Sequence, residues 1–287
     1  MRHASWLLGS LLWLTTGAAH AATDPAIGDR PAPTPIRAGK IVLVGDSTTA
    51  VQGGWGPAFC ARHVTSFLTC TNLARGGRST YNYRAEGSWA LAEAEMRTPG
   101  YATTWVLVQF GHNDQPGKPG RSTDLQREFP NNLRRYVREI RAAGAQPVLL
   151  TPLTRRQFAQ GVLIDDLAPW ADVVRAVARE LDVPLVDLHA RSRAVVQALG
   201  PVGAMPLAQA APSAAQVSAA LGGTTVGAAP VAGAPAVQNN AVAEPMGQAK
   251  VAFDYTHLGP DGAAVFATLV TTELAREVPA LRSMLIP

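Results

Sequence analysis

The sequence predicts an α/β fold of three layers, in which helices cover both faces of a parallel sheet of about five strands. The first observation is the regular alternation of strand-like and helix-like stretches between residues 40 and 200. The second is the composition, because 287 residues that are 47% hydrophobic and only 16% charged can bury a large core. The third is that polar, glycine-rich loops follow the strands, at the edge where α/β proteins bind ligands.

The elements follow one another in a strand–helix order. Strands are expected at Ile41–Val44, Thr69–Leu73, Trp105–Gln109, Pro147–Thr151 and Pro184–Leu188. Helices are expected at Ala58–Val64, Gly87–Met96, Phe129–Ala143, Ala168–Leu181, Ala190–Leu199 and Asp261–Glu277. The helix Phe129–Ala143 repeats apolar residues on one face, and Gly144 ends it. The arrangement predicts a flavodoxin-like sheet within one α/β/α domain.

The chain divides by composition into four parts. Residues 1–22 are expected to be a signal peptide, 23–39 an extended leader, and 40–200 with 251–287 a single domain. Residues 201–250 form a low-complexity insertion rich in Ala, Pro and Gly, and we expect it to be mobile. The net charge of +4 is small and the arginines are dispersed, which argues against a nucleic-acid partner.

The first residues predict export to the periplasm or beyond. A short basic start precedes the apolar run Trp6–Thr16, and cleavage is expected after Ala21 or Ala22. The alternative is a retained membrane anchor, but the apolar run is shorter than the roughly 20 residues that cross a bilayer. We expect no membrane span in the mature chain. In an oxidising compartment Cys60 and Cys70 are candidates for a disulfide; the alternative is two buried free thiols.

Ser47 is the candidate nucleophile. It follows the buried run Lys40–Gly45, where the strand is expected to pass into a helix that brings free N–H groups to the same edge. The alternative is an ordinary helix N-cap, since serine is common there.

His257 is the candidate catalytic base, and Asp254 is the candidate carboxylate that orients it. A serine hydroxyl needs a base and a third group that orients the base. A separation of three residues in a turn before the last helix lets the Asp254 carboxylate reach the imidazole. The alternative for His257 is a histidine of a surface turn.

Two other loops supply candidate oxyanion donors. The loop Ala74–Thr80 contains Gly76 and Gly77, which allow a backbone N–H to turn inward, and Asn113 follows the third strand with an amide that can donate. Taken alone, each is an ordinary turn.

These segments resemble, in order, the four blocks of the SGNH (GDSL-type) hydrolases. The blocks are Gly45-Asp46-Ser47, the Gly76-Gly77 loop, Gly111-His112-Asn113-Asp114 and Asp254-Tyr255-Thr256-His257. The similarity covers roughly 40–200 and 251–276. Within these hydrolases the sequence resembles the rhamnogalacturonan acetylesterases, through Gly77-Arg78-Ser79, His112 and the segment Thr151–Phe158.

The resemblance implies a role for each candidate residue. Ser47 is the nucleophile, His257 the base and then acid, and Asp254 orients it. The oxyanion donors are the N–H of Ser47, the N–H of Gly77 and the Asn113 side chain. The implied enzyme is a serine acetylesterase that works through an acetyl-serine intermediate, without a metal or organic cofactor. A metal held by His112 with Asp114, or by Asp254 with His257, is disfavoured.

The expected substrate is an acetylated carbohydrate of the plant cell wall, recognised through its acidic pectic units. Six cations fall in or near the loops at the carboxyl edge of the sheet, where they could bind the carboxylates of such a substrate: Arg75, Arg78, Lys118, Arg121, Arg155 and Arg156. Arg78, His112 and Arg155 are the predicted substrate contacts. Four aromatic residues are candidates for stacking on sugars, although the two tryptophans suit the core equally well: Trp55, Tyr81, Tyr83 and Trp89.

Three other interpretations remain open. A lipase, a thioesterase or another carbohydrate acetylesterase would use the same residues. A noncatalytic carbohydrate-binding module would retain none of the chemistry. A structural envelope protein would use the 201–250 insertion. The sequence does not determine the oligomeric state.

Overall fold

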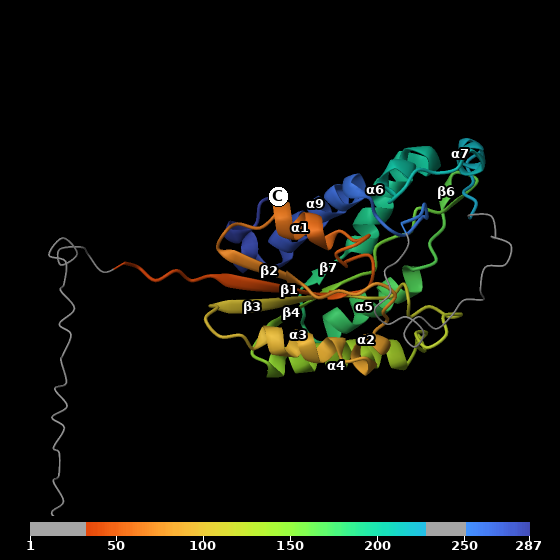
Figure 1. The fold of residues 1–287 in the computed structure, drawn as a ribbon. Coiled ribbons are helices and arrows are strands. Elements are labelled where there is room, and N and C mark those ends of the chain that lie inside the picture. The colour runs from red at the N-terminus through yellow and green to blue at the C-terminus, as the bar shows by residue number, and fades with distance from the viewer. Residues whose placement is uncertain (1–32, 228–250) are drawn as a thin grey trace, which may run out of the picture. The chain divides into compact units, whose positions relative to one another are not determined.

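The centre of the molecule is a sheet of five parallel strands in the order β2-β1-β3-β4-β7 (Figure 1). The structure is a computed structural model that describes residues 33–227 and 251–287. The strands are β1 (Gly39–Gly45), β2 (Leu68–Asn72), β3 (Thr103–Gln109), β4 (Gln146–Leu150) and β7 (Leu185–Val186). The five-stranded parallel sheet predicted from the sequence is confirmed.

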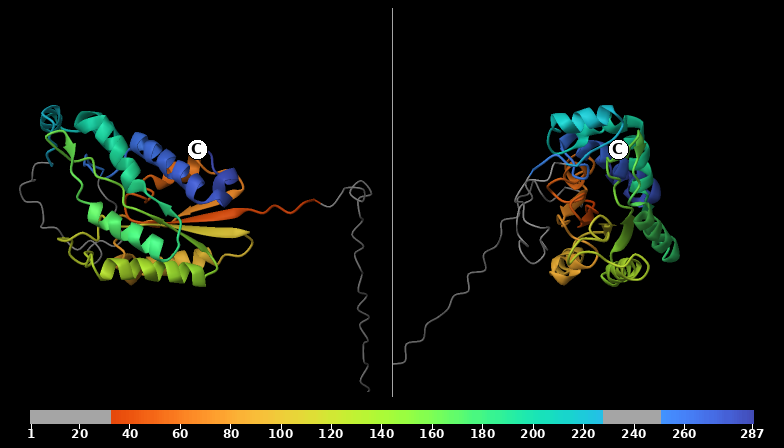
Figure 2. Two further views of the ribbon diagram at one scale, coloured as in Figure 1. Left: turned by 180° about the vertical axis from the view of Figure 1, so that it is seen from behind. Right: turned by 90° about the vertical axis from the view of Figure 1, so that its right-hand side faces the viewer.

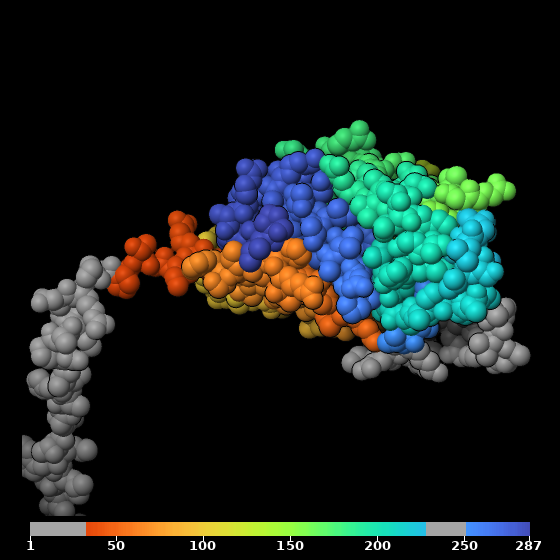
Figure 3. All heavy atoms as spheres, turned by 90° about the horizontal axis from the view of Figure 1, so that it is seen from above, coloured from red at the N-terminus to blue at the C-terminus, as the bar shows by residue number. Residues whose placement is uncertain are grey.

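Helices cover both faces of this sheet, as Figures 1 and 2 show. One face carries α1 (Gly56–Arg62), α6 (Leu188–Gly203) and α9 (Pro260–Glu277). The other carries α2 (Asn82–Ala85), α3 (Ser88–Met96), α4 (Glu128–Ala142) and α5 (Ala168–Glu180). The last helix α9 packs against α1, so the C-terminal segment lies beside the segment that follows β1 (Figure 3).

Alternate residues of β1 contribute to two separate cores. Ile41 and Leu43 pack into the cluster under α1, α6 and α9, whereas Val42 and Val44 pack into the cluster under α3, α4 and α5. All four side chains are fully buried. A strand that is buried on both faces has a continuous apolar run, which is why β1 is recognisable in the sequence.

The segment 201–227 differs from the mobile insertion that the sequence predicts. It contains the end of α6, the 3-10 helix η1 (Met205–Leu207) and the helix α7 (Ala214–Leu221). Ser213 and Gln216 form a reciprocal capping box that begins α7. Low charge and many alanines are typical of disorder, but alanine is also the strongest helix former. Residues 228–250 lie outside the described residues.

Short elements that the sequence analysis did not predict complete the structure. They are α2, the two-stranded sheet of β5 (Phe158–Ala159) and β6 (Val162–Leu163), and the C-terminal 3-10 helix η2 (Pro279–Met284). Among the described residues, no helix is both long and apolar enough to cross a membrane. The predicted signal peptide (1–22) and most of the leader (23–39) also lie outside the described residues.

Cys60 and Cys70 form a disulfide that joins α1 to β2, with 5.4 Å between their Cα atoms. The pairing predicted from the sequence is present. The bond ties the helix that follows the loop after β1 to the strand that precedes the loop after β2.

Candidate active site

Ser47 lies in a turn directly after β1, at the carboxyl edge of the sheet. The side chain of Asp46 fixes this turn, because its Oδ1 accepts hydrogen bonds from the N–H and the hydroxyl of Thr48, both at 2.8 Å. Helix α1 begins only at Gly56, with Trp55 as its N-cap residue. Ser47 is therefore not a helix cap, and the helix N-terminus that the sequence predicted beside it is absent.

The loop after β2 lies against this serine. The Arg75 N–H donates to the Gly45 carbonyl at 3.0 Å, which carries the loop along the end of β1. A side chain on Gly76 would begin 3.7 Å from the Cβ of Ser47. Gly77 has a φ of +75°, a left-handed conformation that glycine adopts without steric cost. Gly76 therefore lies beside Ser47, and Gly77, the predicted donor, is the next residue of the same loop.

Asn113 lies in the loop after β3 and is 7% exposed. Its Nδ2 donates to the Arg78 carbonyl at 3.1 Å, and its Oδ1 accepts a hydrogen bond from Nη1 of Arg121 at 3.5 Å. The amide thus contacts the loop that carries Gly77. Because the NH₂ group has two hydrogens, one remains after the bond to Arg78.

Asp114 is hydrogen-bonded to the loop that carries Gly77, through Thr80. Its buried Oδ1 accepts hydrogen bonds from the Thr80 N–H at 3.0 Å, the Thr80 hydroxyl at 2.5 Å and the Thr123 hydroxyl at 3.0 Å. Burial raises the pKa of this carboxyl group to about 7, although the hydrogen bonds act in the opposite direction.

His112 is only 3% exposed, and its predicted contact with substrate stays a prediction. Its Nδ1 lies 3.4 Å from Oδ2 of Asp46, the residue that fixes the Ser47 turn. Burial lowers the pKa of His112, against the attraction of Asp46. The pKa of Asp46 is also lowered: burial raises it, but the attraction of His112 and the hydrogen bonds from Thr48 outweigh that effect. We therefore assign His112 to the support of the Ser47 turn.

Asp254 and His257 form the hydrogen-bonded pair that their spacing predicted. Nδ1 of His257 lies 2.6 Å from Oδ2 of Asp254, and the other carboxylate oxygen accepts from the His257 N–H at 2.7 Å. Burial raises the pKa of Asp254, but its bonds to His257 outweigh this and bring the pKa to about 2. Since Nδ1 is occupied by the carboxylate, Nε2 is the imidazole nitrogen left for a proton transfer.

A backbone contact joins this turn to the segment that follows Ser47. The Leu258 N–H donates to the Gly53 carbonyl at 2.9 Å. A side chain on Gly53 would begin 3.3 Å from the Cβ of His257. Segments that lie far apart in the sequence therefore meet at the carboxyl edge of the sheet, as the catalytic hypothesis requires.

Comparison with known proteins identifies the family. A family model described as the GDSL-like Lipase/Acylhydrolase family matches residues 43–199, more than half of the chain. The chain belongs to this family. The resemblance to SGNH (GDSL-type) hydrolases is thereby confirmed.

Two relatives of this hydrolase come from Bacillus subtilis (strain 168). Rhamnogalacturonan acetylesterase RhgT is 36% identical over 170 residues, which cover 56% of this chain and 70% of RhgT. Probable rhamnogalacturonan acetylesterase YesY is 34% identical over 164 residues, which cover 55% of this chain and 73% of YesY. The chain is a carboxylic ester hydrolase rather than a noncatalytic binding module or structural protein.

A solved structure shares the fold of this hydrolase. The crystal structure of the protein YxiM from Bacillus subtilis has a TM-score of 0.58 at 22% identity. The match covers 84% of this chain and 57% of YxiM, so the hydrolase spans little more than half the length of that protein.

Five of the six predicted cations of the hydrolase, all except Arg75, fall into two groups. Arg78 and Arg155 are bound to acidic partners: Arg78 Nε donates to Glu86 at 2.8 Å, and Arg155 pairs with Asp166. Arg156 is only 2% exposed and lies behind the Asp254–His257 turn, so its prediction as a cation on the open edge is wrong. The sequence shows that an arginine is charged, but it does not show which way its side chain points.

Lys118 and Arg121 belong to the second group. Burial lowers the pKa of Lys118, and Arg155 and Arg121 lower it further by repulsion. Burial also lowers the pKa of Arg121, with Arg78 acting in the same direction. The Arg121 N–H donates to the Lys118 carbonyl at 3.0 Å, so both cations belong to one turn, and an anion bound between them would relieve their repulsion.

Three of the four aromatic candidates belong to the core. Trp55, Tyr83 and Trp89 are at most 3% exposed. The Trp55 indole donates to the side chain of Gln109 at 2.7 Å, a buried contact that the sequence analysis missed. Tyr81 is 48% exposed and remains the one candidate of the four for stacking on a sugar.

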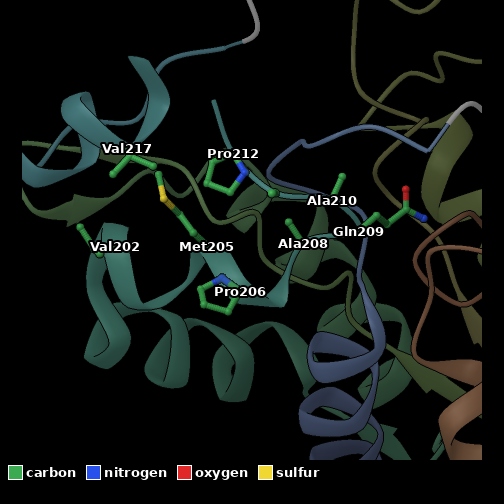
Figure 4. A pocket seen from close by; sticks show the side chains of 9 residues that line it. Val202, Met205, Pro206, Ala208, Gln209, Ala210, Pro212 and Val217 are labelled. Carbon is green, nitrogen blue, oxygen red and sulfur yellow. The ribbon is translucent and has the colours of Figure 1, made fainter. Parts of the chain in front are cut away.

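An open hollow of about 500 Å³ includes Ala208, which forms a β-bridge with Leu258, the residue after His257 (Figure 4). Its lining is mostly apolar and comes from the end of α6, η1, the loop between η1 and α7, and α7 itself, with Val202, Met205, Pro212 and Val217 among its residues. Gln209, at one side of the hollow, lies against Gly53. The hollow was not predicted, because the alanine-rich composition of 201–227 gave no sign of a fixed structure.

No group of three or more His, Cys, Asp and Glu side chains placed to hold a metal occurs within 33–227 and 251–287. His112 lies with Asp46, and His257 with Asp254, as pairs.

Proposed function

We propose that this hydrolase removes acetyl groups from plant cell-wall polysaccharides or oligosaccharides of the pectic, rhamnogalacturonan type. Two relatives carry the name rhamnogalacturonan acetylesterase. The observation within this chain that supports an acidic substrate is the cationic cluster of Lys118 and Arg121. Arg121 contacts Asn113, and its Nη1 would lie 3.4 Å from a side chain on Gly77. A substrate carboxylate bound there would lie next to the oxyanion donors.

We assign the acylation step to Ser47 and His257. His257 Nε2 takes the proton of the Ser47 hydroxyl as its oxygen attacks the ester carbonyl carbon. The backbone N–H groups of Ser47 and Gly77 and the free N–H of Asn113 donate to the oxyanion. When the intermediate collapses, the bond to the sugar oxygen breaks and the imidazolium returns its proton to that oxygen.

The deacylation step repeats this chemistry with water. His257 takes a proton from water as the water oxygen attacks the acetyl-serine carbonyl. The collapse of the second intermediate releases acetate and returns the proton to the Ser47 oxygen. Throughout, the ionised Asp254 carboxylate holds Nδ1 protonated and stabilises the imidazolium.

Acetate release from three acetylated polymers tests the substrate. We expect the fastest release from acetylated rhamnogalacturonan, slower release from acetylated homogalacturonan and xylan, and none with Ser47→Ala. Preference for xylan would contradict the pectic assignment while leaving the serine mechanism intact.

A charge variant tests the acidic subsite directly. Arg121→Met should raise KM for acetylated pectic oligomers about tenfold, because a charge-assisted bond is lost, and should change KM for 4-nitrophenyl acetate far less. Arg134→Met is the matched control, since Arg134 on α4 pairs with Glu180 on α5. Equal losses on both substrates would contradict the subsite.

The apolar hollow supports a second candidate function, the hydrolysis of esters with longer acyl chains. A lipase or thioesterase needs an apolar channel beside the nucleophile, and the hollow lies near the His257 turn. A series of 4-nitrophenyl esters of increasing chain length separates the two functions. A sharp preference for acetyl supports the acetylesterase, whereas rising kcat/KM with chain length supports the alternative.

We also propose that the protein is exported. The Cys60–Cys70 disulfide supports an oxidising compartment. Cell fractionation and N-terminal sequencing test this proposal, and the mature chain is expected to begin at Ala22 or Thr23. A cytoplasmic protein that retains residues 1–22 would contradict it.

A further inference from the structure

Arg156 contacts every residue of the turn that carries the candidate base. Its side-chain Nη2 donates to the carbonyls of Asp254 at 2.9 Å and His257 at 2.8 Å, and its Nη1 donates to the Thr256 carbonyl at 3.3 Å. Its backbone N–H donates to the remaining carbonyl, that of Tyr255, at 2.8 Å. One residue from the loop after β4 thus binds all four carbonyls of the turn.

The catalytic pair has little other support from burial. The side chains of Asp254 and His257 are 41% and 32% exposed. The hydrogen bonds within the turn fix these two residues relative to each other but not relative to Ser47. Efficient proton transfer requires the imidazole at hydrogen-bond distance from the serine, so the turn needs anchors outside itself.

The loop that carries Arg156 is itself fixed to the body of the domain. The Thr154 N–H donates to the Ser192 hydroxyl at 3.1 Å, and the Phe158 N–H donates to the Thr225 hydroxyl at 2.8 Å. Phe158 is fully buried in the core under α6 and α9. The bonds from Arg156 therefore connect the turn to a rigid part of the structure.

We propose that Arg156 is a positioning residue that holds the Asp254–His257 turn in register with Ser47. The proposal rests on the proposed roles of Ser47 and His257, but not on the identity of the ester. A planar guanidinium has donors on separate nitrogens and reaches several carbonyls at once, whereas a lysine ammonium donates from a single point. A lysine in place of Arg156 should therefore hold the turn only in part.

A buried cation elsewhere in the molecule provides the matched control. Lys40 is fully buried, and its Nζ donates to the carbonyl of Glu95 at 3.1 Å and to its carboxylate at 2.6 Å. It lies near the beginning of β1, whereas Ser47 follows the end of that strand. Lys40→Met therefore removes a buried cation from the fold without touching the turn.

The experiment compares Arg156→Met, Arg156→Lys and Lys40→Met with the unmodified enzyme. Steady-state hydrolysis of 4-nitrophenyl acetate is measured well below the thermal unfolding midpoint of each variant, together with the rate at which a fluorophosphonate labels Ser47. For Arg156→Met we expect kcat and the labelling rate to fall about 10- to 100-fold with little change in KM, because small displacements of catalytic groups have effects of this size. Arg156→Lys should lose less, and Lys40→Met should keep both rates within about twofold after correction for the folded fraction.

Three outcomes would overturn the proposal. One is a folded Arg156→Met whose kcat and labelling rate match the unmodified enzyme, and another is an equal loss in Lys40→Met. If Arg156→Met does not fold, the lysine variant decides, and full activity of folded Arg156→Lys with unchanged labelling contradicts the proposal. Ser47→Ala and His257→Ala are measured in parallel: if they remain active, the proposed function has failed rather than the role of Arg156.

Discussion

The two halves of the candidate active site are held in different ways. Ser47, Gly77 and Asn113 lie in loops that follow β1, β2 and β3, and the side chains of Asp46 and Asn113 are at most 7% exposed. The Asp254–His257 turn precedes α9, follows no strand of the sheet, and has both side chains about one-third exposed or more. The sheet positions the first half, and individual hydrogen bonds position the second.

This contrast separates two kinds of vulnerability. The nucleophile half is stabilised by the same burial and strand pairing that stabilise the fold, so damage to its position should also damage stability. The base half depends on Arg156, Gly53 and the bond between Asp254 and His257. Changes there should reduce turnover while leaving the fold intact.

The largest effect on kcat is expected from removing the nucleophile of the first half, the base of the second half, or both. Ser47→Ala and His257→Ala should each lower kcat by about 10⁵- to 10⁶-fold, and the double variant should lose little more, because both residues act in one proton transfer. Hydrolysis of 4-nitrophenyl acetate measures all three. Multiplicative losses in the double variant would show that the halves do not act as a unit.

Asp254→Asn should lower kcat by about 10⁴-fold, because an amide favours the wrong tautomer of His257. The folded pKa of Asp254, about 2, lies below its ordinary value of 3.8, so the stability it contributes is present above 3.8 and is lost as the pH falls through about 2. Because Asp254 stays ionised from about pH 5 to about pH 8, the factor by which Asp254→Asn lowers kcat should be uniform over this range. A kcat that recovers at one end of this range would argue against an orienting role.

Asn113→Ala tests the first half at a residue that donates a hydrogen bond rather than transferring a proton. We expect kcat to fall about 10²- to 10³-fold with a small change in KM, the usual cost of one oxyanion donor. The exposed Asn131 on α4 supplies the control Asn131→Ala, which should leave kcat unchanged. A loss confined to KM would assign Asn113 to substrate binding instead.

The first half can be predicted from the sequence because local patterns determine it. A buried strand such as Ile41–Val44 is recognisable as an apolar run, and the end of each parallel strand points to the same edge. These patterns are enough to place the loops of Ser47, Gly77 and Asn113 at the same edge of the sheet. The helix expected beside Ser47 is wrong, since a turn fixed by Asp46 intervenes before α1.

The second half is only partly predictable. The spacing of Asp254 and His257 indicates their hydrogen bond, which is local. The contact between Arg156 and this turn joins residues about a hundred positions apart through backbone carbonyls, which leave no mark in the sequence. The sequence therefore indicates only a surface cation at Arg156. Helix α7 escapes prediction for a different reason, because its alanine-rich composition also suits a disordered segment.

The disulfide tests whether the first half depends on the rigidity of its supports. Replacing Cys60 and Cys70 together by alanine should lower the free energy of unfolding by about 2 to 3 kcal/mol, since the unfolded chain gains freedom. Because the bond lies between α1 and β2 rather than at Ser47, kcat below the unfolding transition should change less than about twofold. Urea unfolding and steady-state kinetics measure the two quantities. A large loss of kcat without a loss of stability would contradict the division between the halves.

The smallest effect is expected from the titration of Asp114, which lies beneath Asn113. Its folded pKa of about 7 is above its ordinary value of 3.8, so the folded state holds the proton more tightly and stability falls as the pH rises through about 7. From about pH 6 to about pH 8 the free energy of unfolding should decrease by about 1.4 kcal/mol from this group. Urea unfolding across this range measures the slope.

Asp114→Asn removes this titration and should remove the slope. The amide oxygen can accept the three bonds that Oδ1 accepts, but an NH₂ group replaces Oδ2, which accepts from the Thr80 N–H at 3.3 Å, so the absolute stability of the variant should also be lower at every pH. The two proteins are therefore compared by how the free energy of unfolding changes with pH, not by its absolute value. If the free energy of unfolding falls equally with pH in Asp114→Asn, another group is responsible for the fall. Asp114 would then be ionised throughout this range, stabilised by the three hydrogen bonds that it accepts.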